Sequence, residues 1–269
     1  MSPRVQIQSA AGRAMDLTGT VAHMGDYAGL RATGGVAIQD DFDWYDGAAG
    51  PRSYNLGAWD QFPTPAGGVQ MIDDSGIGLG YLRVNNPAAA GGIRSRKQFQ
   101  LPTKTSATVN LSCAMPWRTV YLEMLIRLKG TLYNITPDNY FFGWHSNAVA
   151  IDFAGGRCIA FVVTNGLPAV ISAVIRDVGE TRFTLPNPPD DDWHVYSIVA
   201  YCQTSPTIDA PGPDFFIDGT LVQSIPSGHA DLTRGPLFVK MGHFNETDAS
   251  LAVAWVEAGY TRRRKGLRP

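Results

Sequence analysis

The sequence predicts an all-β protein, a two-sheet antiparallel β-sandwich with an N-terminal extended arm, and three observations carry this prediction. Only four glutamates and five lysines occur in 269 residues, although these residues normally fill the exposed faces of helices. The 29 glycines and 18 prolines make up about 17% of the chain, above the usual ~12%, which favours many turns. Short alternating apolar segments are separated by those turn residues. With 44% hydrophobic residues the chain can bury a core, which excludes wholesale disorder.

The first 38 residues differ in composition from the rest of the chain. Residues 1–38 are rich in Gly, Ala and Thr, with little alternation and no large apolar cluster. We expect them to form the arm, which either docks on another surface or extends the domain peripherally. The sandwich domain is expected over residues 39–260.

From residue 40 onward the pattern is strand after strand. The clearest strand covers 119–129, where every second residue is apolar and shares one face. The dipeptide Asp218-Gly219 lies between two apolar runs and predicts a tight hairpin turn, because it supplies the positive φ angles that such a turn needs. The other expected strands cover 80–84, 93–99, 107–113, 140–145, 149–153, 158–163, 169–175, 181–185, 193–202, 214–217, 220–225, 237–242 and 251–260.

The formal net charge of −2 conceals an asymmetry along the chain. Without the five basic residues of the last eight, 17 basic residues face 24 acidic ones, about −7 for the body. A basic tail over 261–269 can dock on an acidic partner surface, or it can be a solvated terminus. Nucleic acid is not an expected partner. The docking candidates are Arg262, Arg263, Arg264, Lys265 and Arg268.

No targeting segment is visible, since the first residues lack an apolar core and a cleavage pattern. No run of 18 apolar residues occurs, so no membrane span is expected. Cys113, Cys158 and Cys202 are odd in number and widely spaced, which indicates buried strand residues rather than a disulfide framework or a metal site. Synthesis in the cytoplasm is the default.

Several segments share a pattern with one known family. They are 40–43 (DDFD), 82–84 followed by 93–95, 192–198 (DWHVYSI), 215–222 (FFIDGTLV) and 252–260 (AVAWVEAGY). In this order they resemble the opening, the early strands, the tryptophan–histidine strand, the hairpin and the closing strand of the concanavalin A-like lectin/glucanase (laminin-G-like) jelly roll. The resemblance covers roughly residues 39–260 and implies that fold.

The resemblance also implies what a catalytic member would carry. Glucanases of this family have a glutamate, an aspartate and a second glutamate alternating on one strand, since one carboxylate attacks or activates water and the other protonates the leaving oxygen. Here Glu123 stands alone on its strand, followed at alternate positions by Leu125 and Arg127, and Asp152 is likewise single. We therefore expect no enzymatic activity, and a hydrolase or lyase of this fold would need its carboxylates on other strands.

The sequence contains no clear pattern for binding a metal or a cofactor. The five histidines are far apart and lack ligand spacing. The run 190–192 of three aspartates could bind calcium, but such a run in a proline-rich loop usually faces solvent. No metal and no cofactor are expected.

Aromatic residues next to polar ones suggest sugar contacts, because pyranose rings stack on flat apolar faces. The segment 140–147 (YFFGWHSN) has this mixture, although its aromatics could equally be core. A polar loop at 245–248 follows a strand end and could face the same ligand. The glycan-binding candidates are Trp144, His145, Asn147, Trp59, Asn245 and Asp248.

Together these features favour a non-catalytic structural protein of a bacteriophage virion, assembled in the host cytoplasm as a head decoration or as a tail or fibre component. The missing carboxylate pair, the missing signal peptide and the two ends outside the core support it. Expected partners are other virion proteins, copies of the chain itself in a homo-oligomer, and host surface polysaccharide. The alternative is a stand-alone lectin-like carbohydrate-binding module.

Overall fold

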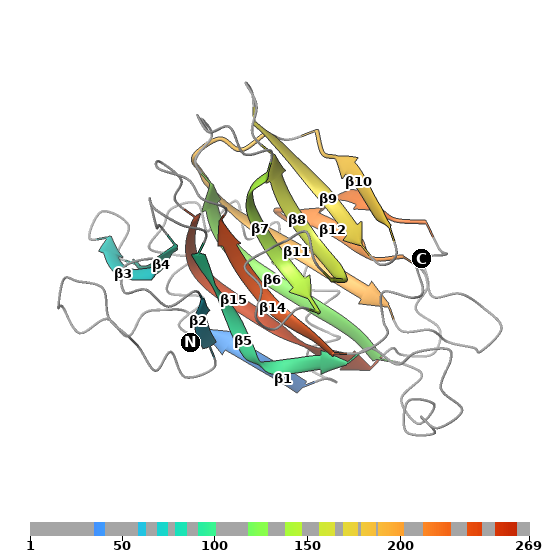
Figure 1. The fold of residues 1–269 in the computed structure, drawn as a ribbon, viewed down its shortest axis with the longest axis horizontal. Coiled ribbons are helices and arrows are strands. Elements are labelled where there is room, and N and C mark those ends of the chain that lie inside the picture. Colours follow the sequence, from blue (N-terminus) through green and yellow to red (C-terminus); the bar gives the residue numbers. More distant parts are fainter. Residues whose placement is uncertain are drawn as a thin grey trace.

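The chain is an all-β sandwich (Figure 1). A computed structural model describes residues 35–40, 59–62, 69–74, 79–84, 91–100, 118–128, 138–146, 156–164, 169–176, 179–186, 188–201, 212–226, 236–243 and 251–262. Within these residues there are fifteen strands and no helix. The predicted fold class is confirmed.

Eight strands form one sheet, called sheet A. Its order is β13-β12-β11-β6-β15-β4-β3, and β1 also pairs with β15. The central pair joins segments far apart in the sequence, since β6 and β15 run antiparallel over eleven register pairs. The strands are β1 (Gly35–Asp40), β3 (Val69–Asp74), β4 (Leu79–Val84), β6 (Arg118–Leu128), β11 (Trp193–Tyr201), β12 (Asp214–Ile217), β13 (Thr220–Ser224) and β15 (Leu251–Arg262).

Seven strands form the opposing sheet, called sheet B. Its order is β10-β9-β8-β7-β14-β5-β2, again with antiparallel neighbours. The strands are β2 (Trp59–Phe62), β5 (Gly91–Gln100), β7 (Asp138–His145), β8 (Cys158–Thr164), β9 (Val170–Arg176), β10 (Glu180–Thr184) and β14 (Pro236–His243).

The core lies between the two sheets and is rich in aromatic side chains. Phe142 and Phe161 of sheet B meet Tyr196 and Phe215 of sheet A, with ring centroids 4.9–5.2 Å apart across the sheets. All four are at most 1% exposed. Such rings bury a large apolar area and add favourable edge-to-face contacts, so they join the sheets firmly.

Most predicted strands are present within a residue or two of their expected bounds. The predicted strands 107–113 and 149–153 lie outside the described residues. The sequence pattern missed β1, β2 and β3, which are short or flanked by glycine-rich stretches. The predicted hairpin is confirmed, because Asp218 (φ 50°) and Gly219 (φ 76°) form the turn between β12 and β13.

Strands run across two of the predicted domain boundaries. The boundary at residue 38 falls inside β1, whose residues Gly35 to Asp40 pair with β15. The sandwich therefore includes at least part of the expected arm, and residues 1–34 lie outside the described residues. The tail predicted to begin at residue 261 overlaps β15, which ends at Arg262.

Among the described residues, no helix is of sufficient length and apolarity to pass through a membrane.

Candidate functional site

The outer face of sheet B consists of the residues that alternate with the core residues of its strands. In the middle of this face lie apolar side chains from β7, β8 and β9, all 2% exposed or less. The middle of the face is therefore closed to a ligand in the described structure. These side chains are Phe141, Cys158, Ala160, Val162 and Val174.

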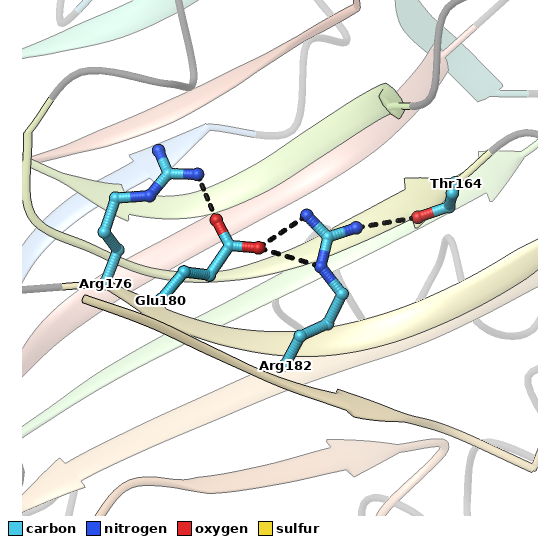
Figure 2. Close-up of polar contacts among 4 residues, drawn as sticks. All are labelled: Thr164, Arg176, Glu180 and Arg182. Atoms are coloured by element: carbon cyan, nitrogen blue, oxygen red, sulfur yellow. Dashed lines mark hydrogen bonds and ion pairs between the residues drawn. The ribbon is translucent and has the colours of Figure 1, made fainter.

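A charged cluster occupies the same face near the sheet edge formed by β10 (Figure 2). The carboxylate of Glu180 lies between two guanidinium groups, as Figure 2 shows. Arg176 donates from Nη2 to Oε2 of Glu180. Arg182 donates from Nε and Nη2 to Oε1, at 2.9 and 2.8 Å. Arg182 also donates from Nη1 to Oγ1 of Thr164 at 2.8 Å. We call these four residues the arginine cluster.

Strand register builds the arginine cluster from a short piece of sequence. Glu180 is the register partner of Arg176, and Arg182 is the partner of Val174. Glu180 and Arg182 are two residues apart on β10, so both side chains leave the same face. The core side of β10 is taken by Phe183, which packs against the core.

The arginine cluster is only partly shielded from water. The side chains of Arg176, Glu180 and Arg182 are 15%, 28% and 27% exposed. Partial burial raises the pKa of Glu180, but the hydrogen bonds and charges of both arginines outweigh it and hold that pKa below the usual value. Glu180 is thus ionised near neutral pH, and the cluster carries two positive charges and one negative charge.

Two other polar groups on this face, the thiol of Cys158 and the ammonium group of Lys240, are buried. Cys158, the register partner of Arg176, is fully buried. Burial raises the pKa of its thiol to about 12, so it is protonated near neutral pH and a poor nucleophile. Lys240 of β14 is 1% exposed, and its Nζ lies 5.6 Å from the centroid of the Phe141 ring.

A second charged cluster, called the His194 cluster, lies at the start of β11 in sheet A. His194 contacts Asp218 Oδ2 through Nδ1 at 2.6 Å and Asp190 Oδ1 through Nε2 at 2.9 Å. The hydrogen bond to Asp218 is the main reason why the pKa of His194 rises to about 9, despite an opposing effect of burial. Asp190, expected to face solvent or bind calcium, thus contacts an imidazolium near neutral pH. No group of three metal-ligating side chains occurs in the described part of the chain.

Two glutamates meet on the outer face of sheet A, which the sequence pattern did not indicate. Glu123 of β6 is the register partner of Glu257 of β15. They are 4% and 3% exposed, and the hydroxyl of Tyr121 donates to Oε1 of Glu257 at 2.9 Å. The expectation that Glu123 stands alone holds along its strand and is wrong across strands.

The predicted glycan contacts are corrected where the structure describes them. Trp144 belongs to the core and is 0% exposed, and His145 is 1% exposed, so neither side chain can touch a sugar in this structure. Trp59 begins β2. The remaining candidates, Asn147, Asn245 and Asp248, lie outside the described residues.

Of the five predicted docking residues, the structure describes Arg262 alone. Arg262 is the last residue of β15, and the other four basic residues lie outside the described residues. Sequence reasoning missed the arginine cluster. An available signal was the spacing of Arg176, Glu180 and Arg182, with Glu180 directly before the expected strand 181–185 and Arg182 two residues later.

Comparison with known proteins shows the fold and no more. No family model matches the chain, and no curated protein matches it. An endo-1,3-β-glucanase from Streptomyces sioyaensis superposes with a TM-score of 0.53 and 14% identity, covering 86% of this chain and 98% of that one. The carbohydrate recognition domain of Emp47p gives 0.51 and 10%, covering 87% and 99%. A conserved carbohydrate esterase from the Shiga toxin-encoding bacteriophage phi24B gives 0.51 and 10%, covering 85% and 99%. The fold is a concanavalin A-like jelly roll.

Proposed function

We propose that the chain is a non-catalytic carbohydrate-recognising jelly roll that serves as a structural protein of a bacteriophage virion. The observation that carries the recognition part is the arginine cluster on the outer face of sheet B, where Arg176 and Arg182 are partly exposed. Polar side chains held rigidly on a strand are suited to fix the orientation of a sugar. The similar structures support this reading, since their names include a carbohydrate recognition domain, a glucanase and a carbohydrate esterase.

The absence of catalysis is supported by the state of the carboxylates. Glycoside hydrolysis needs a protonated acid and a second, ionised carboxylate on either side of the bond. Glu180 is the carboxylate of the arginine cluster, and its lowered pKa disfavours a role as proton donor. Glu123 and Glu257 form a pair, but at 4% and 3% exposed they cannot reach a polysaccharide.

The virion setting is supported by two features. One similar structure comes from a bacteriophage. The sequence also predicts an N-terminal arm and a basic tail, which are suited to docking on other virion proteins or on further copies of the chain. A stand-alone lectin-like module is the alternative, and it differs in needing neither a particle nor an oligomer.

A glycan array with the purified chain tests the recognition part, and a reducing-end assay on β-glucans and on the bound glycans tests the absence of catalysis. We expect binding to at least one polysaccharide and no release of reducing ends. An array without any binding would refute carbohydrate recognition, and reducing ends released at a steady rate would refute the non-catalytic role. Size-exclusion chromatography with light scattering tests the assembly part of the proposal. A chain that stays monomeric at all concentrations would contradict the expected homo-oligomer.

A further inference from the structure

We infer that the arginine cluster recognises a carboxylated sugar, so that the ligand of the proposed carbohydrate site is an acidic polysaccharide. This inference rests on the proposed function and adds the chemical class of the ligand. It starts from the charge of the cluster, in which Arg176 and Arg182 share the single carboxylate of Glu180. Among the four residues of the cluster, the guanidinium groups thus exceed the carboxylate by one positive charge, and both are partly exposed at the edge of sheet B.

The alternative, a neutral sugar bound by ring stacking, finds no exposed aromatic ring among the side chains described around the arginine cluster. Phe141 is 1% exposed, and Leu221 of sheet A is the one large hydrophobic residue that is substantially exposed among the described residues. The charged side chains that a ligand can reach beside β10 are those of Arg176, Arg182 and Glu180, two cations and one anion. A ligand bound here is thus selected by charge and hydrogen bonding, which favours an anionic group.

The geometry suits a carboxylate in particular. Guanidinium groups are planar forks whose paired N–H groups match the two oxygens of a carboxylate. Thr164 and Glu180 hold Arg182 through three hydrogen bonds of 2.8–2.9 Å. This side chain is therefore ordered before a ligand arrives, which lowers the entropic cost of binding. The fixed strand positions also set the spacing of the two guanidinium groups along the sheet edge.

The experiment measures binding of the full chain to polygalacturonate and to the same polymer after complete methyl esterification, by biolayer interferometry at low salt. Esterification keeps the backbone and removes the charge. We expect binding to the acidic polymer that weakens with added salt, and at least about tenfold weaker binding to the ester. Arg176→Gln and Arg182→Gln should each weaken binding to the acidic polymer about tenfold, and Arg182→Lys should fall between them and the wild type.

A matched control separates the cluster from general charge. Arg94 lies on the same face in β5, next to Phe238, with β14, β7, β8 and β9 between it and β10. Arg94→Gln removes the same charge and should change affinity less than twofold. Equal losses for Arg94→Gln and Arg182→Gln would overturn the inference, and so would equal binding of polygalacturonate and dextran sulfate that no variant alters.

The outcomes also separate this inference from the proposed function. Binding confined to neutral glycans on the array would leave carbohydrate recognition standing and overturn the acidic ligand. An array without any binding would overturn both. Each variant's thermal midpoint is recorded, and Arg182→Lys keeps the charge if Arg182→Gln proves unstable.

Discussion

The arginine cluster of sheet B and the His194 cluster of sheet A combine charged groups in opposite proportions. The arginine cluster has two cations around one carboxylate, Glu180. The His194 cluster has one cation between two carboxylates, those of Asp190 and Asp218. One therefore carries an excess of positive charge and the other an excess of negative charge.

The two clusters differ also in what they hold. The aspartates of the His194 cluster bind backbone as well as side chain: Asp218 Oδ1 accepts the N–H of Val195 at 2.9 Å, and Asp190 Oδ1 accepts the N–H of Asp192 at 2.9 Å. The hydrogen bonds described for the arginine cluster join side chain to side chain. We infer that the His194 cluster fixes two loops, whereas the arginine cluster orders side chains at the surface of sheet B.

The largest effect should come from Asp218→Ala, which breaks the His194 cluster. Asp218 adopts φ 50°, which costs about 1–2 kcal/mol for a residue such as alanine. The N–H of Val195 also loses its acceptor, at about 1–3 kcal/mol. We expect the free energy of unfolding in urea to fall by about 3 kcal/mol.

Asp218→Asn serves as the matched control for this change. Asparagine tolerates positive φ and keeps an oxygen for Val195, and it loses only the charge facing His194. The free energy of unfolding should fall about half as much for Asp218→Asn as for Asp218→Ala. Equal losses would show that the turn geometry contributes nothing beyond the ion pair.

The next effect is a dependence of stability on pH that His194 imposes. Its pKa is raised from 6.5 to about 9, so above pH 6.5 the folded protein keeps a proton that the unfolded chain releases. The stabilising contribution is therefore complete below pH 6.5 and is lost as the pH rises through 9. We expect a loss of about 1–3 kcal/mol between pH 6 and pH 9.5, reduced from the full value because the aspartates are 38% and 49% exposed.

Urea unfolding at several pH values measures this dependence, with His194→Gln as control. The variant should be less stable at pH 6 and should lose less stability on going to pH 9.5. A variant with the same pH slope as the wild type would assign the dependence to other groups.

The sequence predicted features that depend on local pattern and missed features that depend on contacts between distant strands. Alternation along 119–129 and the Asp218-Gly219 turn are local signals, and both elements form as predicted. The pairing of Glu123 with Glu257 depends on which strands become neighbours, and these residues are 134 positions apart along the chain, so no local pattern contains it. The prediction for Trp144 failed for a related reason. A mixture of aromatic and polar residues fits both an exposed platform and a core strand, and packing against the opposing sheet decides between them.

A smaller effect is expected for Asp190→Asn at the edge of the His194 cluster. Asp190 is 49% exposed at its side chain, so its ion pair with His194 is screened by water. Asparagine keeps an acceptor for the N–H of Asp192. The free energy of unfolding at pH 7 should fall by less than about 1 kcal/mol, and a loss as large as that of Asp218→Ala would contradict the assignment of the main restraint to Asp218.

The smallest effect on stability, and an opposite one on binding, should come from Glu180→Gln in the arginine cluster. Glutamine keeps an oxygen for the N–H groups of Arg182 and removes the negative charge, so the cluster goes from one excess positive charge to two. Because Glu180 is 28% exposed, the free energy of unfolding should change by less than about 1 kcal/mol. Affinity for polygalacturonate should rise about threefold at low salt. It should return to the wild-type value near 0.5 M salt, where the Debye length is about 4 Å.

Glu180→Ala serves as the control, because it removes the charge and the oxygen together. Its smaller gain in affinity would measure how much the orientation of Arg182 contributes. If Glu180→Gln instead destabilises the fold as much as Asp218→Asn does, the two clusters hold the structure in the same way and the distinction between them fails.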